Sequence, residues 1–327
     1  MTAHPEGARP AAVHSLDPQV AKLLAWVEKA GGPSYREIGA AAARAHYASI
    51  AGTLDIAPAP MHAVDDLAVA LPGRTLRVRH YVPREHGWAD PMPALLYFHG
   101  GGFTIGSVDT HDRICRMLAR DADCVVLSVD YRLAPEHPFP AAADDAFDAL
   151  AWLRREVHAL GVDPARIAVG GDSAGGTLAT ASAIHARDAG WPLALQLLIY
   201  PGVAGRQASP SHREFGEGFL LDFDLVAWFF ANYVRGEADR DDWRFAPLSH
   251  PDLRGVAPAW IAIADHDPLR DDDRAYAARL REAGVPVDAV EYPGMIHAFF
   301  QHGGFVPMAR RAHADAAAAL RRAFGQA

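Results

Sequence analysis

The sequence predicts an α/β protein in which a mostly parallel β-sheet is flanked by helices. From about residue 76 onward, short apolar segments typical of strands alternate with longer segments of helical periodicity. Several of the apolar segments are hydrophobic at every position, as expected of strands that helices cover on both faces. The chain has 327 residues, half of them hydrophobic, so it is long enough to bury a large core.

The first fifty residues are expected to form two helices. The pair Asp17-Pro18 is typical of a helix start, with Asp as the N-cap and Pro at the first helical position. Glycines at 31–32 end that segment. Ser34 is followed three residues later by Glu37, which predicts a capping box and a second helix.

The strands and helices expected after these two helices follow one another in regular order. Strands are expected at residues 76–81, 94–98, 124–129, 167–170, 195–200, 260–264 and 287–292. Helices are expected at residues 112–120, 141–157, 174–187, 272–283 and 308–324. This alternation is typical of a parallel sheet with helices on both faces.

About sixty residues between Tyr200 and Trp260 interrupt the alternation, which is too long for a plain crossover. They contain an aromatic helix with Asp222 or Asp224 near its start and Gly236 beyond its end. Two interpretations are open. The helix is either ordinary core packing or a lid, whose apolar face covers a cleft and contacts a hydrophobic substrate.

Composition excludes several classes of partner. The net charge is −9 and there is no basic block, which argues against nucleic acid and anionic membranes. No apolar run reaches the roughly 18 residues of a membrane span. Residues 1–15 lack the apolar core of a secretory signal, so we expect a cytoplasmic location. The two cysteines form no disulfide framework, and no zinc-ligand spacing occurs, so we expect no metal.

The string from Gly171 to Gly175, GDSAG, has the form G-x-S-x-G. Between an apolar strand and a helix, such a string places a serine hydroxyl on a strained, exposed turn. Glycines two residues before and after Ser173 allow the backbone and the helix to approach closely. The helix N-terminus favours a developing negative charge. Ser173 is therefore the predicted nucleophile. In the alternative interpretation it is only a helix N-cap between chance glycines.

A serine hydroxyl needs a base to become a good nucleophile. Behind a G-x-S-x-G turn the expected chain order is Ser, then Asp or Glu, then His. His297 follows the last expected strand and is the predicted base, with His302 as its nearest rival. Asp265 and Asp267 both follow the penultimate strand, and their spacing does not decide which of them orients the imidazole.

The string His99-Gly100-Gly101-Gly102 follows the expected strand at residues 94–98. An HGGG loop offers backbone N–H groups to an oxyanion, and the residue after the nucleophile, here Ala174, offers one more. We expect His99 and Gly100 to support the loop. The alternative is a glycine turn with a purely structural role.

Together these strings resemble the hormone-sensitive lipase family of α/β-hydrolases, in its bacterial carboxylesterase branch. The matching segments are residues 99–103 (HGGGF), 130–142 (DYRLAPEHPFPAA), 171–176 (GDSAGG), 267–270 (DPLR) and His297. The resemblance implies an α/β-hydrolase fold with a mostly parallel eight-stranded sheet and a helical cap. It selects Asp267 over Asp265 and assigns the oxyanion donors to Gly101, Gly102 and Ala174.

The resemblance also implies a division of the chain. Residues 1–52 would form N-terminal cap helices, residues 204–245 a cap insertion, and residues 53–203 with 246–327 the catalytic core. The candidate residues of a substrate pocket are Phe103, Trp228 and Phe229. Glu136 is a candidate to support the site from behind.

These observations predict a serine carboxylesterase that hydrolyses short- to medium-chain carboxylic esters through an acyl-enzyme, with no metal and no organic cofactor. The expected partner is a small-molecule ester, without nucleic acid and without stable membrane insertion. A homodimer is a candidate assembly. The alternatives are an amidase, a peptidase or a lipase on the same triad, and a small-ligand receptor without turnover.

Overall fold

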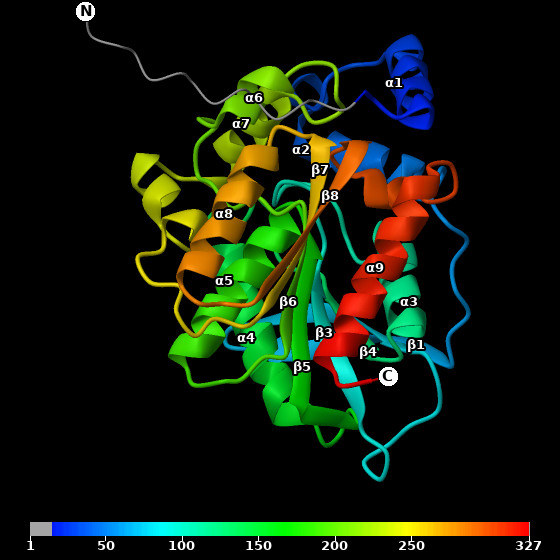
Figure 1. Cartoon of the computed structure of the whole chain (residues 1–327), viewed down its shortest axis with the longest axis vertical. Coiled ribbons are helices and arrows are strands. Elements are labelled where there is room, and N and C mark those ends of the chain that lie inside the picture. The colour runs from blue at the N-terminus through cyan, green and yellow to red at the C-terminus, as the bar shows by residue number, and fades with distance from the viewer. Residues whose placement is uncertain (1–14, 327) are drawn as a thin grey trace, which may run out of the picture.

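An eight-stranded sheet forms the centre of the computed structural model, which describes residues 15–326 (Figure 1). The strand order is β1-β2-β4-β3-β5-β6-β7-β8. Strand β2 runs antiparallel to β1 and β4, and the other neighbouring pairs are parallel. The mostly parallel eight-stranded sheet is therefore confirmed. The strands are β1 (Ala63–Leu71), β2 (Arg74–Val82), β3 (Met92–Phe98), β4 (Val125–Val129), β5 (Val162–Asp172), β6 (Leu195–Ile199), β7 (Ala259–His266) and β8 (Val287–Ile296).

Seven of these strands coincide with expected ones, and β1 is an addition. It pairs only with β2, so it lies at the edge of the sheet. Asp65 and Asp66 interrupt its apolar pattern, and both are exposed. An edge strand tolerates such residues because one of its faces meets water. For this reason the continuous apolar pattern that identified the inner strands is absent from β1.

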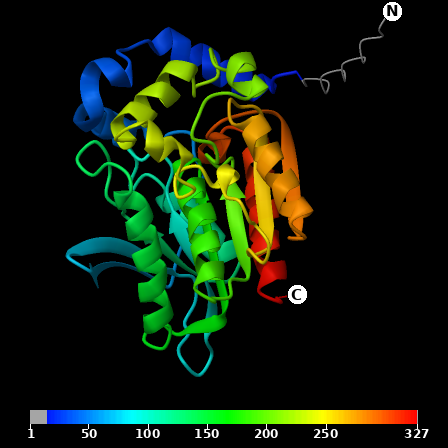
Figure 2. The same ribbon diagram turned by 90° about the vertical axis from the view of Figure 1, so that its left-hand side faces the viewer.

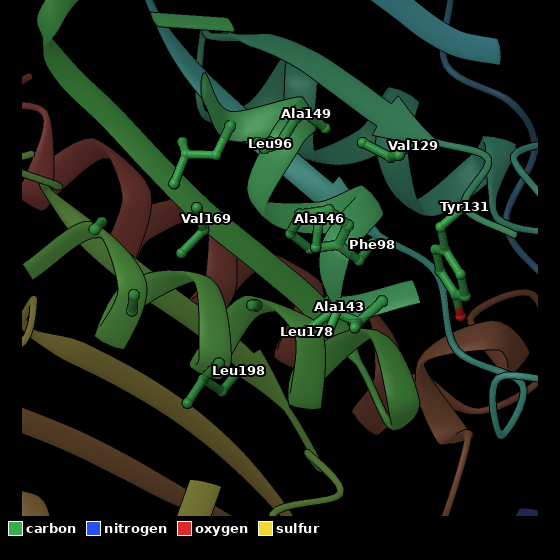
Figure 3. Close-up of a cluster of buried hydrophobic side chains, with 14 of the residues drawn as sticks. Leu96, Phe98, Val129, Tyr131, Ala143, Ala146, Ala149, Val169, Leu178 and Leu198 are labelled. Carbon is green, nitrogen blue, oxygen red and sulfur yellow. The ribbon is translucent and has the colours of Figure 1, made fainter. Parts of the chain in front are cut away.

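Helices cover both faces of the sheet, as predicted (Figure 1). On one face lie α4 (Ala141–Glu156), α5 (Ala174–Asp188) and α8 (Arg270–Glu282); on the other lie α3 (Asp112–Asp121) and α9 (Pro307–Ala323). Successive side chains of β3 alternate between the two cores, with Leu96 on the α5 face and Leu95 on the α9 face. Figure 3 shows the core on the α5 face, where alanines of α4 pack near Leu96 and Val169.

Four helices lie above the carboxyl ends of the parallel strands (Figure 1, Figure 2). They are α1 (Pro18–Ala30), α2 (Tyr35–Ile50), α6 (Pro210–Glu214) and α7 (Phe223–Tyr233), and we call them the cap helices. The predicted N-caps of α1 and α2 are present, including the capping box of Ser34 and Glu37. Asp222 proves to be the N-cap of α7, since its carboxylate accepts a hydrogen bond from the Leu225 N–H at 2.6 Å.

Three short 3₁₀ helices complete the described chain: η1 (Glu237–Asp241), η2 (Pro247–Ser249) and η3 (Phe299–His302). Cys115 and Cys124 are free, buried thiols. Between residues 15 and 326, no helix is both long and apolar enough to cross a membrane. Residues 1–14, on which the N-terminal expectation depends, lie outside the described part of the chain.

The sheet order collects the predicted motifs at one edge. Strand β3 ends just before the HGGG string and pairs with β5, which ends just before Ser173, with Phe98 opposite Gly171. Strand β7 ends just before Asp267 and pairs with β8, which ends just before His297. Because all four strands are parallel, these loops meet at the carboxyl edge of the sheet, where open α/β sheets bind ligands.

Candidate active site

Ser173 occupies a strained turn between β5 and α5. Its φ is 54°, in the left-handed region that a residue with a side chain rarely adopts. The turn is held by its own backbone: the Ser173 N–H donates to the Ile199 carbonyl at 2.9 Å, and the Ser173 carbonyl accepts from the Gly202 N–H at 3.0 Å. The end of strand β6 and the loop that follows it therefore hold the strained residue through both its N–H and its carbonyl group.

The glycines beside the serine are required by close packing. A Cβ atom on Gly175 would lie 1.9 Å from the Phe98 carbonyl oxygen, and one on Gly171 would lie 2.5 Å from the same oxygen. Neither glycine has a positive φ, so their conformation alone does not demand glycine. The end of β3 approaches the turn at Ser173 so closely that only a hydrogen atom fits at these two positions.

His297 joins the serine to Asp267. The Nε2 atom of His297 lies 2.9 Å from Ser173 Oγ, and its Nδ1 atom lies 2.7 Å from Asp267 Oδ2. All of Asp267 is buried, and His297 is 7% exposed. A carboxylate beside Nδ1 favours the tautomer with its proton on that nitrogen, which leaves Nε2 free to accept the serine proton.

The remaining contacts separate the two candidate carboxylates. The second oxygen of Asp267, Oδ1, accepts a hydrogen bond from the Leu269 N–H at 2.9 Å. Asp265 instead accepts from the Gly294 N–H at 3.3 Å. The structure therefore brings Asp267, and not Asp265, to the imidazole of His297.

The side chain of His302, the other candidate base, contacts the backbone of its own loop. The Nδ1 atom of His302 lies 3.1 Å from the Ala298 carbonyl oxygen, within the same turn. Burial lowers the pKa of His302 to about 4, although the hydrogen bond to Ala298 opposes this effect. It is therefore neutral at neutral pH, and Ser173 meets His297 instead.

Asp273, on the first turn of α8, is fully buried near the carboxylate of Asp267. Burial, followed by the negative charges of Asp267 and Asp272, raises the pKa of Asp273 well above its usual range. The surroundings of Asp273 therefore favour its protonated form. The sequence gives no sign that Asp273 is buried, because acidic residues in a first helical turn are ordinary.

The glycine loop, residues 99–102, has a backbone conformation that favours glycine at its last two positions. The φ values of Gly101 and Gly102 are 119° and 57°. A Cβ atom would lie 2.3 Å from the Ile105 carbonyl oxygen at Gly101, and 2.1 Å from the Phe229 ring at Gly102. Gly101, Gly102, Ser173 and Ala174 line one cavity, so the predicted oxyanion donors and the nucleophile are neighbours.

Asp172 anchors the start of the glycine loop. Its Oδ1 atom accepts hydrogen bonds from the Tyr97 hydroxyl at 2.6 Å and from the Gly100 N–H at 3.0 Å. Burial by itself raises the pKa of Asp172, but the charge and hydrogen bond of His111 and the hydrogen bond of Tyr97 outweigh it and lower the pKa below its usual value. Sequence reasoning missed this residue, although it lies inside the G-x-S-x-G string.

Two further residues support the loop from the DYRLAPE segment. The ring of His99 stacks on Tyr131 with centroids 4.3 Å apart, and the Tyr131 hydroxyl donates to the His99 carbonyl at 2.7 Å. Glu136 pairs with Arg44 of α2 at 2.9 Å, and the Arg44 Nε donates to the Thr104 carbonyl at 2.7 Å. Glu136 therefore supports the site indirectly, through a cap helix.

A cavity of about 490 Å³ lies between the cap helices and the sheet edge. Phe103 and Phe229 are among its walls, whereas Trp228 is not. The expectation for Trp228 is corrected: it is buried in the cap, with its ring 6.2 Å from that of Tyr35. Adjacent residues of a helix point about 100° apart, so Phe229 faces the cavity while Trp228 faces α2. The other walls are mainly apolar and include Val27, Ile50, Leu221, Val226 and Phe245.

Comparison with known proteins agrees with this geometry. A model of the alpha/beta hydrolase fold family matches residues 95–301. The carboxylic ester hydrolase LipN of Mycobacterium tuberculosis is 44% identical over 275 residues, which are 80% of this chain and 72% of LipN. The ethyl acetate hydrolase of Pseudomonas putida is 44% identical over 236 residues, which are 72% of this chain and 74% of that protein.

Solved structures agree as well. The ester hydrolase EH1AB1 from the metagenome of Lake Arreo, in complex with a derivative of bipyridine phosphonate, superposes with a TM-score of 0.91. The two chains are 40% identical, over 95% of this chain and all of the other. The chain therefore belongs to the α/β-hydrolase family, among the hormone-sensitive-lipase-like bacterial esterases.

Proposed function

We propose that this carboxylic ester hydrolase forms an acyl-enzyme on Ser173, with His297 as the base and Asp267 as the carboxylate that orients it. One observation carries the proposal: Ser173 Oγ, His297 and Asp267 form a continuous line of contacts of 2.9 Å and 2.7 Å at the wall of an apolar cavity. Nucleophile, base and orienting group in hydrogen-bond reach are the arrangement that nucleophilic catalysis requires.

In the first half of the reaction, His297 Nε2 takes the Ser173 proton while Oγ attacks the ester carbonyl carbon. The carbonyl oxygen becomes an oxyanion, which the N–H groups of Gly101, Gly102 and Ala174 bind. Removing one such donor typically costs about 2.7–4 kcal/mol of transition-state stabilisation. When the tetrahedral intermediate collapses, the bond to the alcohol oxygen breaks and His297 gives its proton to that oxygen.

In the second half, His297 takes a proton from water as the water oxygen attacks the acyl carbon. The second tetrahedral intermediate collapses, the carboxylic acid leaves, and Ser173 recovers its proton from His297. Asp267 stays ionised throughout and stabilises the imidazolium that forms twice in each cycle. The cycle consumes only ester and water.

We propose esters with short to medium acyl chains as substrates. The cavity is small, about 490 Å³, and its walls are mainly apolar, which suits an uncharged ester of modest size. One relative is named ethyl acetate hydrolase, and ethyl acetate is an ester with a two-carbon acyl group. The cap division at residues 1–52 and 204–245, the cytoplasmic location, the homodimer and the exclusion of nucleic-acid and membrane partners stay predictions.

The test is a series of p-nitrophenyl esters from acetate to palmitate, with the wild-type enzyme and a Ser173→Ala variant. We expect kcat/KM to be highest for short to medium chains, and kcat of Ser173→Ala to fall about a million-fold. Circular dichroism should show that the variant is folded. Near-native turnover by the variant would contradict the nucleophile, and a maximum at palmitate would contradict the chain length. A fluorophosphonate probe should label the wild type and not the variant.

Matched ester and amide substrates separate this proposal from an amidase or peptidase on the same triad. An amide has the poorer leaving group, so its hydrolysis depends more strongly on proton donation to that group. We expect the ester to be hydrolysed much faster than the amide of the same acyl group. Equal rates would favour the amidase alternative.

A further inference from the structure

A chain of polar contacts joins cap helix α2 to the glycine loop. The Tyr47 hydroxyl lies 2.8 Å from the side-chain amide of Gln301, and that amide lies 2.8 Å from His111 Nε2. The same His111 nitrogen lies 3.2 Å from Asp172 Oδ2, and Asp172 Oδ1 accepts the Gly100 N–H at 3.0 Å. The chain of contacts therefore ends next to the two glycines that the proposed function assigns to the oxyanion.

The members of this chain come from separate parts of the fold. Tyr47 belongs to α2, His111 precedes α3, Asp172 ends β5, and Gln301 lies in η3, in the same loop as His297. His111 is 1% exposed and Asp172 is 3% exposed. Polar groups buried to this degree depend on each other as partners, because water cannot replace a lost contact.

The Asp172 end of the chain leaves the glycine loop no room to shift. A Cβ atom on Gly100 would lie 2.3 Å from Asp172 Oδ2, so the loop backbone rests directly on the carboxylate. The Tyr97 hydroxyl of β3 holds the other carboxylate oxygen at 2.6 Å. A displacement of Asp172 would therefore move Gly100 with it.

The same cap helix also holds the far end of the loop. Arg44 of α2 donates from Nε to the Thr104 carbonyl and from Nη2 to the Ala134 carbonyl, both at 2.7 Å. The Thr104 N–H in turn donates to the Gly101 carbonyl at 3.0 Å. Arg44 and Tyr47 are three residues apart, on one side of a helix. Helix α2 is therefore linked to both ends of the glycine loop, through Tyr47 at its start and through Arg44 at its end.

We infer that four residues are positioning residues: Asp172, His111, Gln301 and Tyr47. Through their contacts, the position of helix α2 determines where the Gly101 and Gly102 amides lie. The inference rests on the proposed function, in which those amides bind the oxyanion. Tyr47 and Gln301 also line the cavity, at the end of the chain of contacts that is farthest from the oxyanion.

The inference predicts an effect on kcat rather than on KM. An oxyanion exists in the transition state and not in the bound ester, so misplaced donors raise the barrier without weakening ground-state binding. A displacement of about 1 Å in a catalytic group can cost on the order of 100-fold in rate. Direct contact of Tyr47 or Gln301 with the substrate would instead change KM, and by different factors for different esters.

The experiment uses Tyr47→Phe, Gln301→Leu and the double variant, assayed with p-nitrophenyl acetate and butyrate. Each single variant should lower kcat about 3- to 10-fold, as expected for the loss of one partly buried hydrogen bond, and leave KM within about twofold. The loss should be the same for both esters. The kcat of the double variant should be no lower than that of the worse single variant. Either substitution alone already interrupts the chain of contacts, so the second adds no further loss.

Tyr276→Phe is the matched control. The Tyr276 hydroxyl also donates to a buried glutamine, Gln196 Oε1 at 3.5 Å, but in the core between α8 and β6. Its removal should leave kcat unchanged. At the other end of the chain, Asp172→Asn keeps the acceptor for Gly100 and Tyr97, so it should retain far more kcat than Asp172→Ala, which should lose at least about 100-fold.

Unchanged kcat in both Tyr47→Phe and Gln301→Leu would overturn the inference, as would additive losses or a change confined to KM. If Asp172→Ala does not fold, these two variants still decide. Failure of the proposed function looks different, because Ser173→Ala would then keep its activity. An inactive Ser173→Ala together with wild-type kcat in Tyr47→Phe and Gln301→Leu would reject the positioning chain alone.

Discussion

The ring of Phe229 packs directly on the α-carbon of Gly102. A Cβ atom on Gly102 would lie 2.1 Å from the nearest ring atom, which is far inside van der Waals contact. A residue of cap helix α7 therefore closes one side of the glycine loop. This contact explains why the loop accepts no side chain at its last position.

Replacement of Gly102 by Ala is expected to lower kcat at least about 100-fold. The new methyl group collides with Phe229 and the residue keeps a φ of 57°, so the loop must move away from the oxyanion position. Gly190→Ala is the control, since Gly190 has a φ of 69° with no atom near its Cβ position. Similar losses of activity in both variants would show that backbone strain, and not the collision, is responsible.

Replacement of Asp267 by Asn should lower kcat by about four orders of magnitude while the fold is retained. The amide can hold the imidazole in the wrong tautomer and cannot stabilise the imidazolium. Asp265→Asn is the neighbouring control, because Asp265 contacts the Gly294 N–H rather than His297. Steady-state kinetics with p-nitrophenyl butyrate measure both, and a larger loss in Asp265→Asn would reverse the assignment of the two carboxylates.

Ser211 of α6 fastens the cap to the segment that follows Asp267. Its hydroxyl donates to the Pro268 carbonyl at 2.6 Å and accepts from the Asp271 N–H at 3.1 Å. Ser211→Ala should lower the free energy of unfolding by about 1–3 kcal/mol, because a buried carbonyl and a partly buried N–H lose their partner. We also expect kcat to fall several-fold. Ser209→Ala, which loses only a contact with Ser211, should change neither quantity much.

The free energy of unfolding should fall on acidification, partly because of His313. Burial lowers the pKa of His313 to about 4, despite its hydrogen bond to the Phe300 carbonyl. The unfolded histidine has a pKa of about 6.5, so below that pH the unfolded state binds the proton first and is stabilised. The contribution of His313 is complete above pH 6.5 and is lost as the pH falls toward 4.

Urea unfolding at pH 7.5 and pH 5 measures this effect. The two pKa values correspond to a loss of about 2 kcal/mol at pH 5. His313→Gln, which cannot take up the proton, should show a smaller difference between the two pH values than the wild type. An equal difference would show that other groups cause the acid sensitivity. His302 and His99 act in the same direction, since burial lowers the pKa of each to about 4.

Most elements of the core could be predicted from the sequence because their signals are local. The continuous apolar runs identified seven strands, and the cap residues Asp17 and Ser34 marked two helix starts, whereas Asp222 and Asp224 stayed alternatives for a third. The edge strand β1 escaped, since Asp65 and Asp66 interrupt its pattern. Trp228 was misplaced because an aromatic residue beside Phe229 looks the same in sequence whichever way the helix is turned.

The supports of the glycine loop could not be predicted. Tyr47 meets Gln301 across 254 residues of chain, and Gln301 meets His111 across 190. None of these residues lies in a sequence motif that predicts which residue it contacts. Their contacts arise only where α2, the residue before α3 and η3 come together in the folded chain.

The sequence by itself determined the nucleophile turn, the glycine loop and the family, because each depends on a few adjacent residues whose backbone geometry is local. The tertiary structure decided which aromatic residue faces the cavity and what holds the loop in place, and it brought to His297 the carboxylate that the family resemblance had selected, Asp267. Ser173 and His297 are separated by 124 residues, and they meet only because parallel strands deliver their loops to one edge of the sheet. Distances of that kind follow from the packing of whole elements, which no short string of residues specifies.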